Sequence, residues 1–272
     1  MPLRAPIAPP PTFTIEAEPA LPVTQPNPDL PVIAYWPSPI GFPADPAPLS
    51  TAWLKRGLRP HSRIAVYDAP GGQPRAYLDP TMKGVEITLP IVERRSGWVS
   101  VLLPSVNRTV AWVPAGPWTT VALRDQLVMV RSTHQILWFR DATLRRSWAV
   151  TLGMESTPTP WGRTFVLGRS RLPGYVYGGT DVLALGAVPD HPDAVPPGLR
   201  GAHIGLHTWY HDGELGQNTT DGCIRLTKSG QELLLAEIAP GTAVVVVDHI
   251  TETGRIRAEA NERSWNRSRD RS

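Results

Sequence analysis

Prolines dominate the first part of this 272-residue chain, because 15 of its 31 prolines lie within residues 1–50. Each proline fixes its own backbone φ and lacks the amide donor that a helix interior or a central strand requires. We therefore expect residues 1–62 to be mostly irregular, a proline-rich and stiff extended spacer. Tyr35, Trp36 and Phe42 are apolar enough to pack on a folded body, but the proline spacing favours the spacer.

Composition limits the possible functions. The 27 Lys and Arg residues against 24 Asp and Glu give a net charge of +3, which is too balanced to indicate nucleic-acid binding. The single cysteine, Cys223, excludes an intrachain disulfide and a cysteine-only metal site. Residues 250–272 are polar and rich in arginine, which is typical of a solvated tail.

The sequence contains no apolar run of about 18 residues, the length that a membrane-spanning helix needs. Residues 1–6 also lack the apolar stretch of a secretory signal, so no signal peptide is visible. Membrane anchoring, if any, is expected to depend on a segment that this chain does not contain.

Residues 63–117 contain short β-like runs separated by turn residues, a pattern that predicts a small barrel. The runs lie at 64–67, 85–92, 97–103 and 109–113. The strings V-Y-D-A-P-G-G at 66–72, G-W-V-S-V-L-L-P at 97–104 and A-W-V-P-A at 111–115 resemble bacterial Src-homology-three-like domains. That resemblance implies a barrel that accompanies a cell-wall enzyme, with Trp98 and Trp112 in its core.

Residues 118–249 are again rich in predicted strands, with expected runs at 127–130, 135–139, 148–150 and 244–247. Ser229 followed by Glu232 fits a capping box and predicts one helix, which Pro240 and Gly241 would end. The expected fold class is mainly all-β: a small barrel followed by a β-sandwich with one or two short helices.

The chemically informative segment surrounds the single cysteine. In a strand, His203, Gly205 and His207 would share one face, which we expect to be unpacked, while Ile204 and Leu206 would point into the core. The hydrophilic loop 210–216 can return the chain toward Cys223. A glycine directly before the cysteine allows close backbone approach, which leaves amides free to face a developing oxyanion.

A cysteine beside a histidine is the simplest way to activate a thiol whose ordinary pKa is about 8.5. The imidazole takes the proton and the thiolate attacks a carbonyl, so the pair predicts acyl transfer. Arg225 offers a planar fork suited to a carboxylate. Zinc bound by His203, His207, His211 and Cys223 is the alternative, but Gly205 and Thr208 argue against the helix that would stack these imidazoles.

Several motifs in order resemble the catalytic core of the L,D-transpeptidase (YkuD-type) family, over about residues 121–248. These motifs are T-P-T-P-W-G-R-T-F at 157–165, I-G-L-H-T at 204–208, T-D-G-C-I-R-L at 220–226 and A-P-G-T-A-V-V-V-V at 239–247. The family signature has a histidine, a loop of a dozen or more residues, and then S/T-H-G-C followed closely by Arg or Asn.

The resemblance implies roles for particular positions. Cys223 would be the nucleophile and His207 the general base, oriented by the main chain of Thr208. Gly222 and Cys223 would line the oxyanion hole, and Arg225 would anchor a substrate carboxylate. The further substrate-binding positions are expected to be Tyr175, Tyr177, Gly178, Thr220, Asp221 and His203.

The implied reaction acylates the cysteine with a peptidoglycan tetrapeptide stem and releases D-Ala. The thioester then passes to the side-chain amine of diaminopimelate in a neighbouring stem, giving a three-to-three cross-link. Acylation by carbapenems is a family trait, and no metal or other cofactor is implied. The expected location is extracytoplasmic, in the bacterial cell envelope.

One position departs from the family pattern, because Asp221 stands where the family has a histidine. A carboxylate beside the thiol opposes thiolate formation through like charge. It could instead hold an imidazolium or meet the acceptor amine. Since His207 is retained, a working enzyme is the prediction. The alternatives are a catalytically weakened or inactive peptidoglycan-binding protein, or an L,D-carboxypeptidase that hydrolyses stem peptides.

Overall fold

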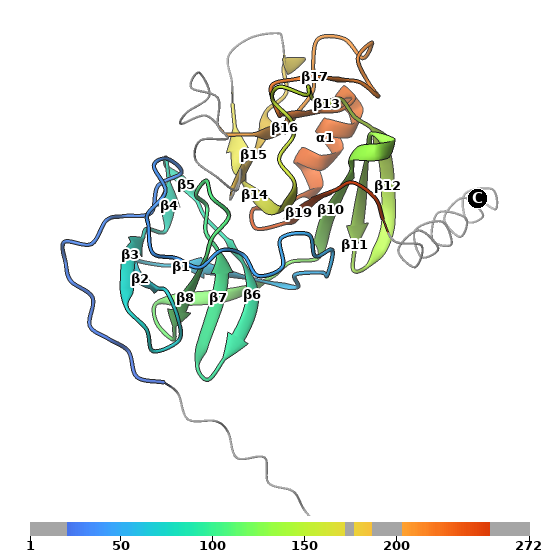
Figure 1. The fold of residues 1–272 in the computed structure, drawn as a ribbon. Coiled ribbons are helices and arrows are strands. Elements are labelled where there is room, and N and C mark those ends of the chain that lie inside the picture. Colours follow the sequence, from blue (N-terminus) through green and yellow to red (C-terminus); the bar gives the residue numbers. More distant parts are fainter. Residues whose placement is uncertain (1–20, 172–176, 187–202, 251–272) are drawn as a thin grey trace, which may run out of the picture.

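The structure is a computed structural model and describes residues 21–171, 177–186 and 203–250. The described residues are mainly β, as the sequence predicts, and form two lobes that each contain one large sheet (Figure 1). The first lobe holds β1 to β9 and the second holds β10 to β19 with the helix α1.

A seven-stranded antiparallel sheet forms the first lobe, in the order β3-β2-β8-β7-β6-β1-β9, and β4 and β5 form a separate hairpin. Its strands are β1 (Arg56–Pro60), β2 (Ile64–Tyr67), β3 (Pro74–Leu78), β4 (Thr81–Met82), β5 (Val85–Glu86), β6 (Leu89–Arg95), β7 (Trp98–Leu102), β8 (Val110–Pro114) and β9 (Trp118–Ala122). Trp98 and Trp112 are buried, in a small cluster with Tyr67 that is separate from the main core of the lobe.

The limits of this sheet differ from the predicted barrel at 63–117. Strand β1 lies inside the predicted spacer, and β9 lies inside the predicted catalytic region. The two strands pair with each other, with Gly57 opposite Val121, and β1 also pairs with β6. Local sequence did not reveal β1 because it is short, ends in proline, and is stabilised by partners more than 30 residues away.

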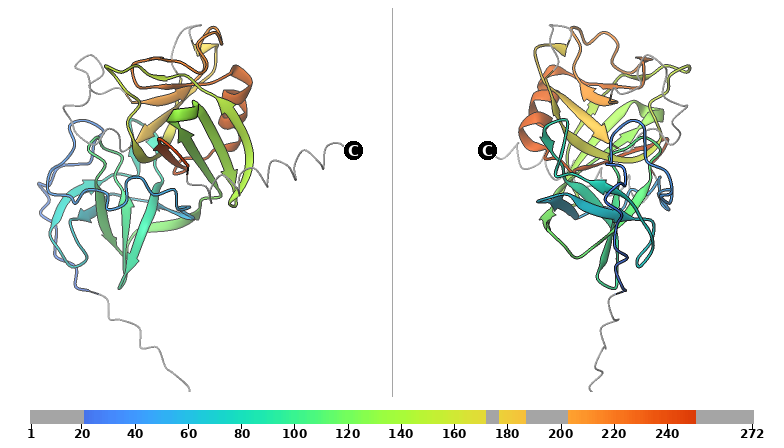
Figure 2. Two further views of the ribbon diagram at one scale, coloured as in Figure 1. Left: turned by 45° about the vertical axis from the view of Figure 1, so that its right-hand side comes forward. Right: turned by 90° about the vertical axis from the view of Figure 1, so that its left-hand side faces the viewer.

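The part of the proline-rich segment that the structure describes is packed on the protein, contrary to the expected spacer. Ile33 and Leu54 are buried, and the amide of Ile33 donates to the carbonyl of Tyr77 at 2.7 Å. Isolated bridges join Val32 to Tyr77 and Ala44 to Thr109. Figure 2 shows this blue segment passing over the first lobe. The prolines prevent regular pairing but leave the intervening amides, carbonyls and apolar side chains available.

The second lobe contains an eight-stranded sheet in the order β12-β11-β10-β19-β14-β15-β16-β18, and a small β13-β17 pair. Its elements are β10 (Asp125–Val130), η1 (Arg131–Thr133), β11 (Gln135–Arg140), β12 (Thr143–Ala149), β13 (Leu152–Gly153), β14 (Gly162–Ser170), β15 (Val182–Gly186), β16 (Gly205–His207), β17 (Asn218–Thr220), β18 (Ile224–Arg225), α1 (Lys228–Glu237) and β19 (Ala243–Val247). The buried run of β19 lies at the centre of the sheet, parallel to β10 and antiparallel to β14.

The N-cap of the helix α1 lies two residues before the predicted one. Its N-cap is Thr227, whose hydroxyl accepts from the amide of Gly230 at 3.2 Å, so the predicted cap, Ser229, lies inside the first turn. Leu234 and Ile238 pack into the core of the second lobe. None of the helices in the described part of the chain has the length and apolar character needed to cross a membrane.

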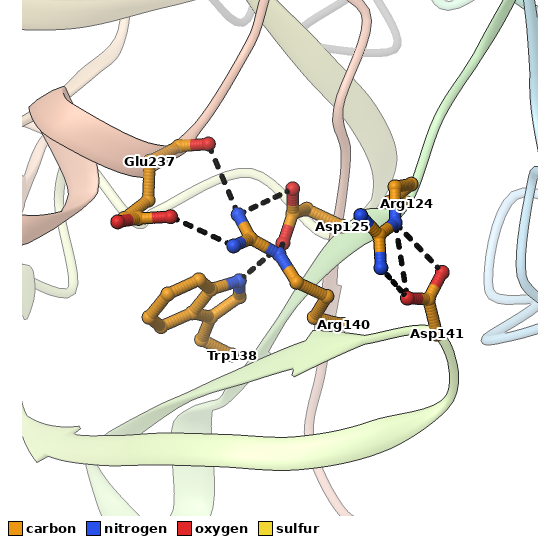
Figure 3. Close-up of polar contacts among 6 residues, drawn as sticks. All are labelled: Arg124, Asp125, Trp138, Arg140, Asp141 and Glu237. Carbon is orange, nitrogen blue, oxygen red and sulfur yellow. Dashed lines mark hydrogen bonds and ion pairs between the residues drawn. The ribbon is translucent and has the colours of Figure 1, made fainter.

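A charged cluster fixes the end of α1 to the sheet (Figure 3). Asp125 is 6% exposed and accepts hydrogen bonds from Trp138 Nε1 at 2.7 Å and from Arg140 Nε at 2.8 Å. Arg140 also bonds the carboxylate of Glu237 at 2.7 Å and its carbonyl at 3.2 Å. These acceptors raise the pKa of Arg140, and its cation lies at the carbonyl end of the helix, where the helix dipole favours positive charge.

Strand β14 of the second lobe contributes side chains to the hydrophobic cores of both lobes. Phe165 and Leu167 of β14 pack into the cluster of the first lobe, whereas Val166 between them packs into the cluster of the second lobe. Strand alternation produces this division, because successive side chains point to opposite faces. Strand β14 therefore joins the lobes through both of its faces.

Candidate active site

The cysteine and two histidines meet at one edge of the eight-stranded sheet. Strands β16 and β18 are parallel, with Leu206 opposite Ile224 and His207 opposite Arg225. This register places Cys223 beside Gly205, whose backbone amide donates toward the thiol. The predicted alternation therefore brings His203 and His207 to the face that carries the thiol. That face is packed, contrary to expectation, since His207 is only 5% exposed.

The imidazole of His207 has a defined tautomer. Its Nδ1 lies 2.6 Å from the carbonyl oxygen of Thr208, and because a carbonyl only accepts, Nδ1 carries the proton and Nε2 is an acceptor. Tyr177 contacts the ring edge-on at a centroid distance of 5.0 Å. Burial lowers the pKa of His207 to about 4, so the imidazole is neutral near pH 7 and can accept a proton.

The turn that carries the nucleophile is held by Thr220. The Thr220 hydroxyl donates to the carbonyl of Cys223 at 2.6 Å and accepts from the amide of Gly222 at 3.2 Å. Gly222 has φ +105°, and a side chain there would lie 3.0 Å from Ile204. The predicted substrate contact of Thr220 is therefore a contact within the protein. The Gly222 amide is already bonded, which leaves the Cys223 amide as the candidate oxyanion donor of the two that we predicted.

The predicted T-P-T-P segment supports this turn. Thr157 donates from its hydroxyl to the carbonyl of Thr220 at 3.2 Å, and Thr159 accepts from the amide of Gly153 at 2.9 Å. A side chain at position 153 would lie 2.3 Å from the carbonyl oxygen of Thr157, so only glycine fits there.

Opposing electrostatic effects act on the thiol. Burial raises the pKa of Cys223, the largest effect, and the charge of exposed Asp221 raises it further. The Gly205 amide and the Arg225 guanidinium lower it, but the pKa of Cys223 remains raised. The resting site thus has a neutral thiol and a neutral imidazole on the same face of the sheet. Such a pair reacts when the base removes the proton during attack.

Arg225, the predicted carboxylate anchor, is already engaged. Its guanidinium lies 2.6 Å from a carboxylate oxygen of Glu214 and 3.8 Å from the ring centroid of Trp209. The hydroxyl of Thr219 also donates to that carboxylate at 2.8 Å. Sequence reasoning missed Glu214 and Trp209, because both lie in or beside a glycine-interrupted loop that looked like a hydrophilic connector.

The remaining predicted positions differ in their surroundings. Gly178, at φ +59°, lies beside Thr208, and a side chain there would approach the Thr208 methyl to 3.2 Å. Tyr175 lies outside the described residues. His203 places Nδ1 3.2 Å from the carbonyl of Leu185 and packs its ring against Tyr35, a residue of the proline-rich segment that sequence reasoning did not place here.

The described residues contain no group of three or more histidine, cysteine or acidic side chains placed to hold a metal ion. The three histidines of the zinc alternative have separate partners. His211 is exposed, accepts from the amide of Gly213 at 3.2 Å, and lies 3.9 Å from Glu214. His207 and His203 turn Nδ1 to the two backbone carbonyls already described.

The fold and the site define a mainly-β protein with a half-buried thiol and a buried imidazole on one face at a sheet edge. Residues 124–246 match the family model of YkuD, the L,D-transpeptidase catalytic domain. Over these residues the second lobe is therefore similar to the L,D-transpeptidase catalytic domain.

Solved structures with a similar fold include three L,D-transpeptidases. The enzyme from Mycobacterium smegmatis is 16% identical, with 58% of this chain and 82% of that chain covered and a TM-score of 0.38. The Enterococcus faecium enzyme is 14% identical, with 61% and 72% covered and a TM-score of 0.37. L,D-transpeptidase 1 of Mycobacterium tuberculosis is 19% identical, with 51% and 77% covered and a TM-score of 0.32. No curated protein matches the sequence.

Proposed function

We propose that this chain is a peptidoglycan L,D-transpeptidase that uses Cys223 as its nucleophile. One observation carries the proposal: within the region that matches the YkuD domain, the only thiol lies on the sheet face that carries a buried histidine, His207. The Nδ1 of this histidine is bonded to the Thr208 carbonyl at 2.6 Å. This arrangement leaves Nε2 of His207 as a base. The proposed first-lobe role, as a Src-homology-three-like companion, rests on sequence resemblance.

In the first half-reaction the sulfur of Cys223 attacks the carbonyl carbon of the peptide bond before the terminal D-Ala of a tetrapeptide stem. Nε2 of His207 takes the thiol proton as the carbon–sulfur bond forms, and the carbonyl electron pair moves to the oxygen. The amide of Cys223 is placed to donate to this oxyanion. When the oxyanion collapses, the carbon–nitrogen bond breaks, and the imidazolium returns its proton to the departing D-Ala amine.

In the second half-reaction the side-chain amine of diaminopimelate in a neighbouring stem attacks the thioester. His207 accepts a proton from this amine, the carbon–sulfur bond breaks, and the sulfur recovers a proton from the imidazolium. The product is a three-to-three cross-link. If water attacks instead, the enzyme is an L,D-carboxypeptidase, so product analysis with and without an acceptor stem separates the two reactions.

The substrate determines the proposed location. Peptidoglycan stems lie outside the cytoplasmic membrane, so the chain would act in the cell envelope, in the periplasm or the cell wall. We propose no nucleic-acid partner and no cofactor, since the half-reactions need only a thiol, an imidazole and backbone amides.

The proposal predicts a covalent adduct with a carbapenem. Cys223 would open the β-lactam ring, with the carbon–sulfur bond forming as the ring carbon–nitrogen bond breaks, so the protein gains the full mass of the drug. Intact-mass spectrometry should show one adduct on the native chain and none on Cys223→Ala. Because the chain has one cysteine, the adduct has one possible thiol.

Native protein that forms no carbapenem adduct and no cross-link with a stem peptide would contradict the proposal. The chain would then be the catalytically inactive peptidoglycan-binding protein that the Asp221 substitution allows. A folded His211→Gln variant is the matched control, because this exposed histidine lies in the neighbouring loop and should leave the adduct unchanged.

Replacing Asp221 tests the departure from the family pattern. The charge of Asp221 raises the pKa of Cys223, so Asp221→Asn and Asp221→His should both accelerate carbapenem acylation. Asp221 is exposed, and screening limits the expected gain to about threefold to tenfold at low salt. Adduct formation followed by intact mass measures the rate.

High salt should reduce the gain from Asp221→Asn, since salt screens exposed charges. Asp212→Asn removes another exposed carboxylate nearby and should leave the rate unchanged. Slower acylation of both Asp221 variants would show instead that the carboxylate takes part in the chemistry.

A further inference from the structure

A tyrosine of the proline-rich segment, Tyr35, lies near the candidate active site. Tyr35 is 3% exposed, and its backbone carbonyl accepts from the amide of Val106 at 3.2 Å. The hydroxyl of Ser105 donates to the preceding carbonyl, that of Ala34, at 2.7 Å. The loop between β7 and β8 of the first lobe therefore fixes the backbone on which Tyr35 is carried.

The side chain of Tyr35 reaches the second lobe. Its ring lies 3.7 Å, centroid to centroid, from the imidazole of His203 at an interplanar angle of 40°. The backbone amide of Ile204 donates to the phenol oxygen. Tyr35 thus contacts the two residues that lead into β16, the strand that carries His207.

The register of β16 and β18 places this contact relative to the thiol. Cys223 lies beside Gly205, while His203 and His207 lie two residues before and after it, roughly 6–7 Å along the strand in each direction. His203, with Tyr35 against it, therefore flanks the thiol on the side away from His207.

The phenol is a neutral hydroxyl at this position. Burial is the main cause that raises the pKa of Tyr35 to about 12, and an ionised Cys223 also raises it. The phenol oxygen accepts from the amide of Ile204, the residue before Gly205, whose own amide donates toward the thiol. Tyr35 keeps its proton at every pH near neutrality.

We propose that Tyr35 is a positioning residue of the Cys223 site, whose ring fixes His203 at one flank of the thiol and whose hydroxyl dipole stabilises the thiolate. The inference rests on the proposed function only in taking Cys223 as the nucleophile. It gives the proline-rich segment a part in the chemistry, because the ring crosses from the first lobe to the catalytic domain.

Alkylation of the single cysteine tests this inference without requiring transpeptidase activity. Iodoacetamide reacts with the thiolate: a carbon–sulfur bond forms, iodide leaves, and the thiol proton passes to solvent. Rates measured by intact mass across a pH series report the ease of forming the thiolate. The titratable and charged groups around the site are Tyr35, His203, His207, Asp221 and Arg225, with Lys83 acting on His203 and Tyr177 packed on His207.

Tyr35→Phe keeps the ring and removes the hydroxyl. We expect its alkylation rate at neutral pH to fall about tenfold, with the profile displaced to higher pH, because a hydrogen-bonding group near a charge is lost. Tyr35→Ala also removes the ring that holds His203, and its rate should fall further.

Tyr67→Phe is the matched control. The hydroxyl of Tyr67 donates to the carbonyl of Thr24 at 2.8 Å, so this variant removes a phenol that also binds the proline-rich segment but lies in the first lobe. Its alkylation profile should equal that of the native chain. The inference is overturned if folded Tyr35→Phe has the native profile, or if Tyr67→Phe slows alkylation as much.

The outcomes also separate this inference from the proposed function. Alkylation that depends on Tyr35 in a chain that forms no carbapenem adduct and no cross-link would retain the inference and reject transpeptidation. If carbapenem acylates the native chain but the alkylation profile does not depend on Tyr35, the proposed function is retained and the inference about Tyr35 is rejected.

Discussion

His207→Gln is expected to lower the rate of carbapenem acylation by about 10²–10⁴-fold, the usual contribution of a positioned general base. The native imidazole is buried, neutral and fixed by the Thr208 carbonyl, so it can take the thiol proton during attack. Glutamine has similar length and can donate to the same carbonyl, but it cannot accept that proton. The loss of acylation rate is measured by stopping the reaction at successive times and determining the carbapenem adduct by intact mass.

The pH dependence provides a second measurement of the same role. The pKa of folded His207 is about 4, so the base is present above that pH and is lost as the pH falls through it. The acid limb of native acylation should therefore lie near pH 4 and not near the ordinary histidine value of about 6.5. In His207→Gln the thiol proton must pass to solvent before the thiolate can attack. The acylation rate of this variant should therefore rise with pH through neutrality.

His211→Gln is the matched variant for both measurements, because His211 is exposed and pairs only weakly with Glu214 at 3.9 Å. Its rate and acid limb should be native. If His207→Gln retains more than about a tenth of the native rate, the imidazole is not the base, a result far outside the expected range.

Asp45→Asn is expected to lower the free energy of unfolding by about 3–5 kcal/mol, the usual effect of removing one partner of a buried ion pair. Asp45 accepts from Arg163 Nε at 2.6 Å, and the side chains of Arg163 and Asp45 are 6% and 1% exposed. The substitution leaves the buried guanidinium of Arg163 without its counter-charge. Because Asp45 lies in the proline-rich segment and Arg163 in β14, this pair links the segment to the second lobe.

Urea unfolding measures the change, with Asp79→Asn as the control. Asp79 also forms a two-bond pair with an arginine, Arg63, but that arginine is 55% exposed, so its loss should cost about 1 kcal/mol or less. The double variant Asp45→Leu with Arg163→Met should be more stable than Asp45→Asn, since it removes both charges. A loss below about 1 kcal/mol for Asp45→Asn would show that the segment does not depend on this pair.

Much of the fold followed from local patterns. The runs 64–67, 135–139 and 244–247 became β2, β11 and β19 with little change, because alternating or continuous apolar residues between turn signals bury the same faces that the sequence indicates. The helix was also predicted, although its cap is Thr227. Strand β1 was not, since its pairing with β6 and β9 is non-local.

The candidate active site likewise contains residues that local sequence predicted and residues that it did not. Cys223, His207 and the orienting carbonyl of Thr208 were predicted from one short stretch, and the structure brings them to one sheet edge. Glu214 and Trp209 were missed because an acidic and an aromatic residue near a loop carry no signal of the arginine that they will contact.

The prolines by themselves predicted that residues 1–50 form neither a helix nor a central strand, because prolines remove amide donors and fix φ, and the described part, residues 21–50, contains neither. They did not determine where the segment lies. Only the tertiary structure decided that the buried carboxylate of Asp45 pairs with Arg163. It also decided that Tyr35 packs on His203, near the thiol. The physical reason is that local backbone restrictions depend on neighbouring residues, whereas burial and ion pairing depend on partners more than 100 residues away.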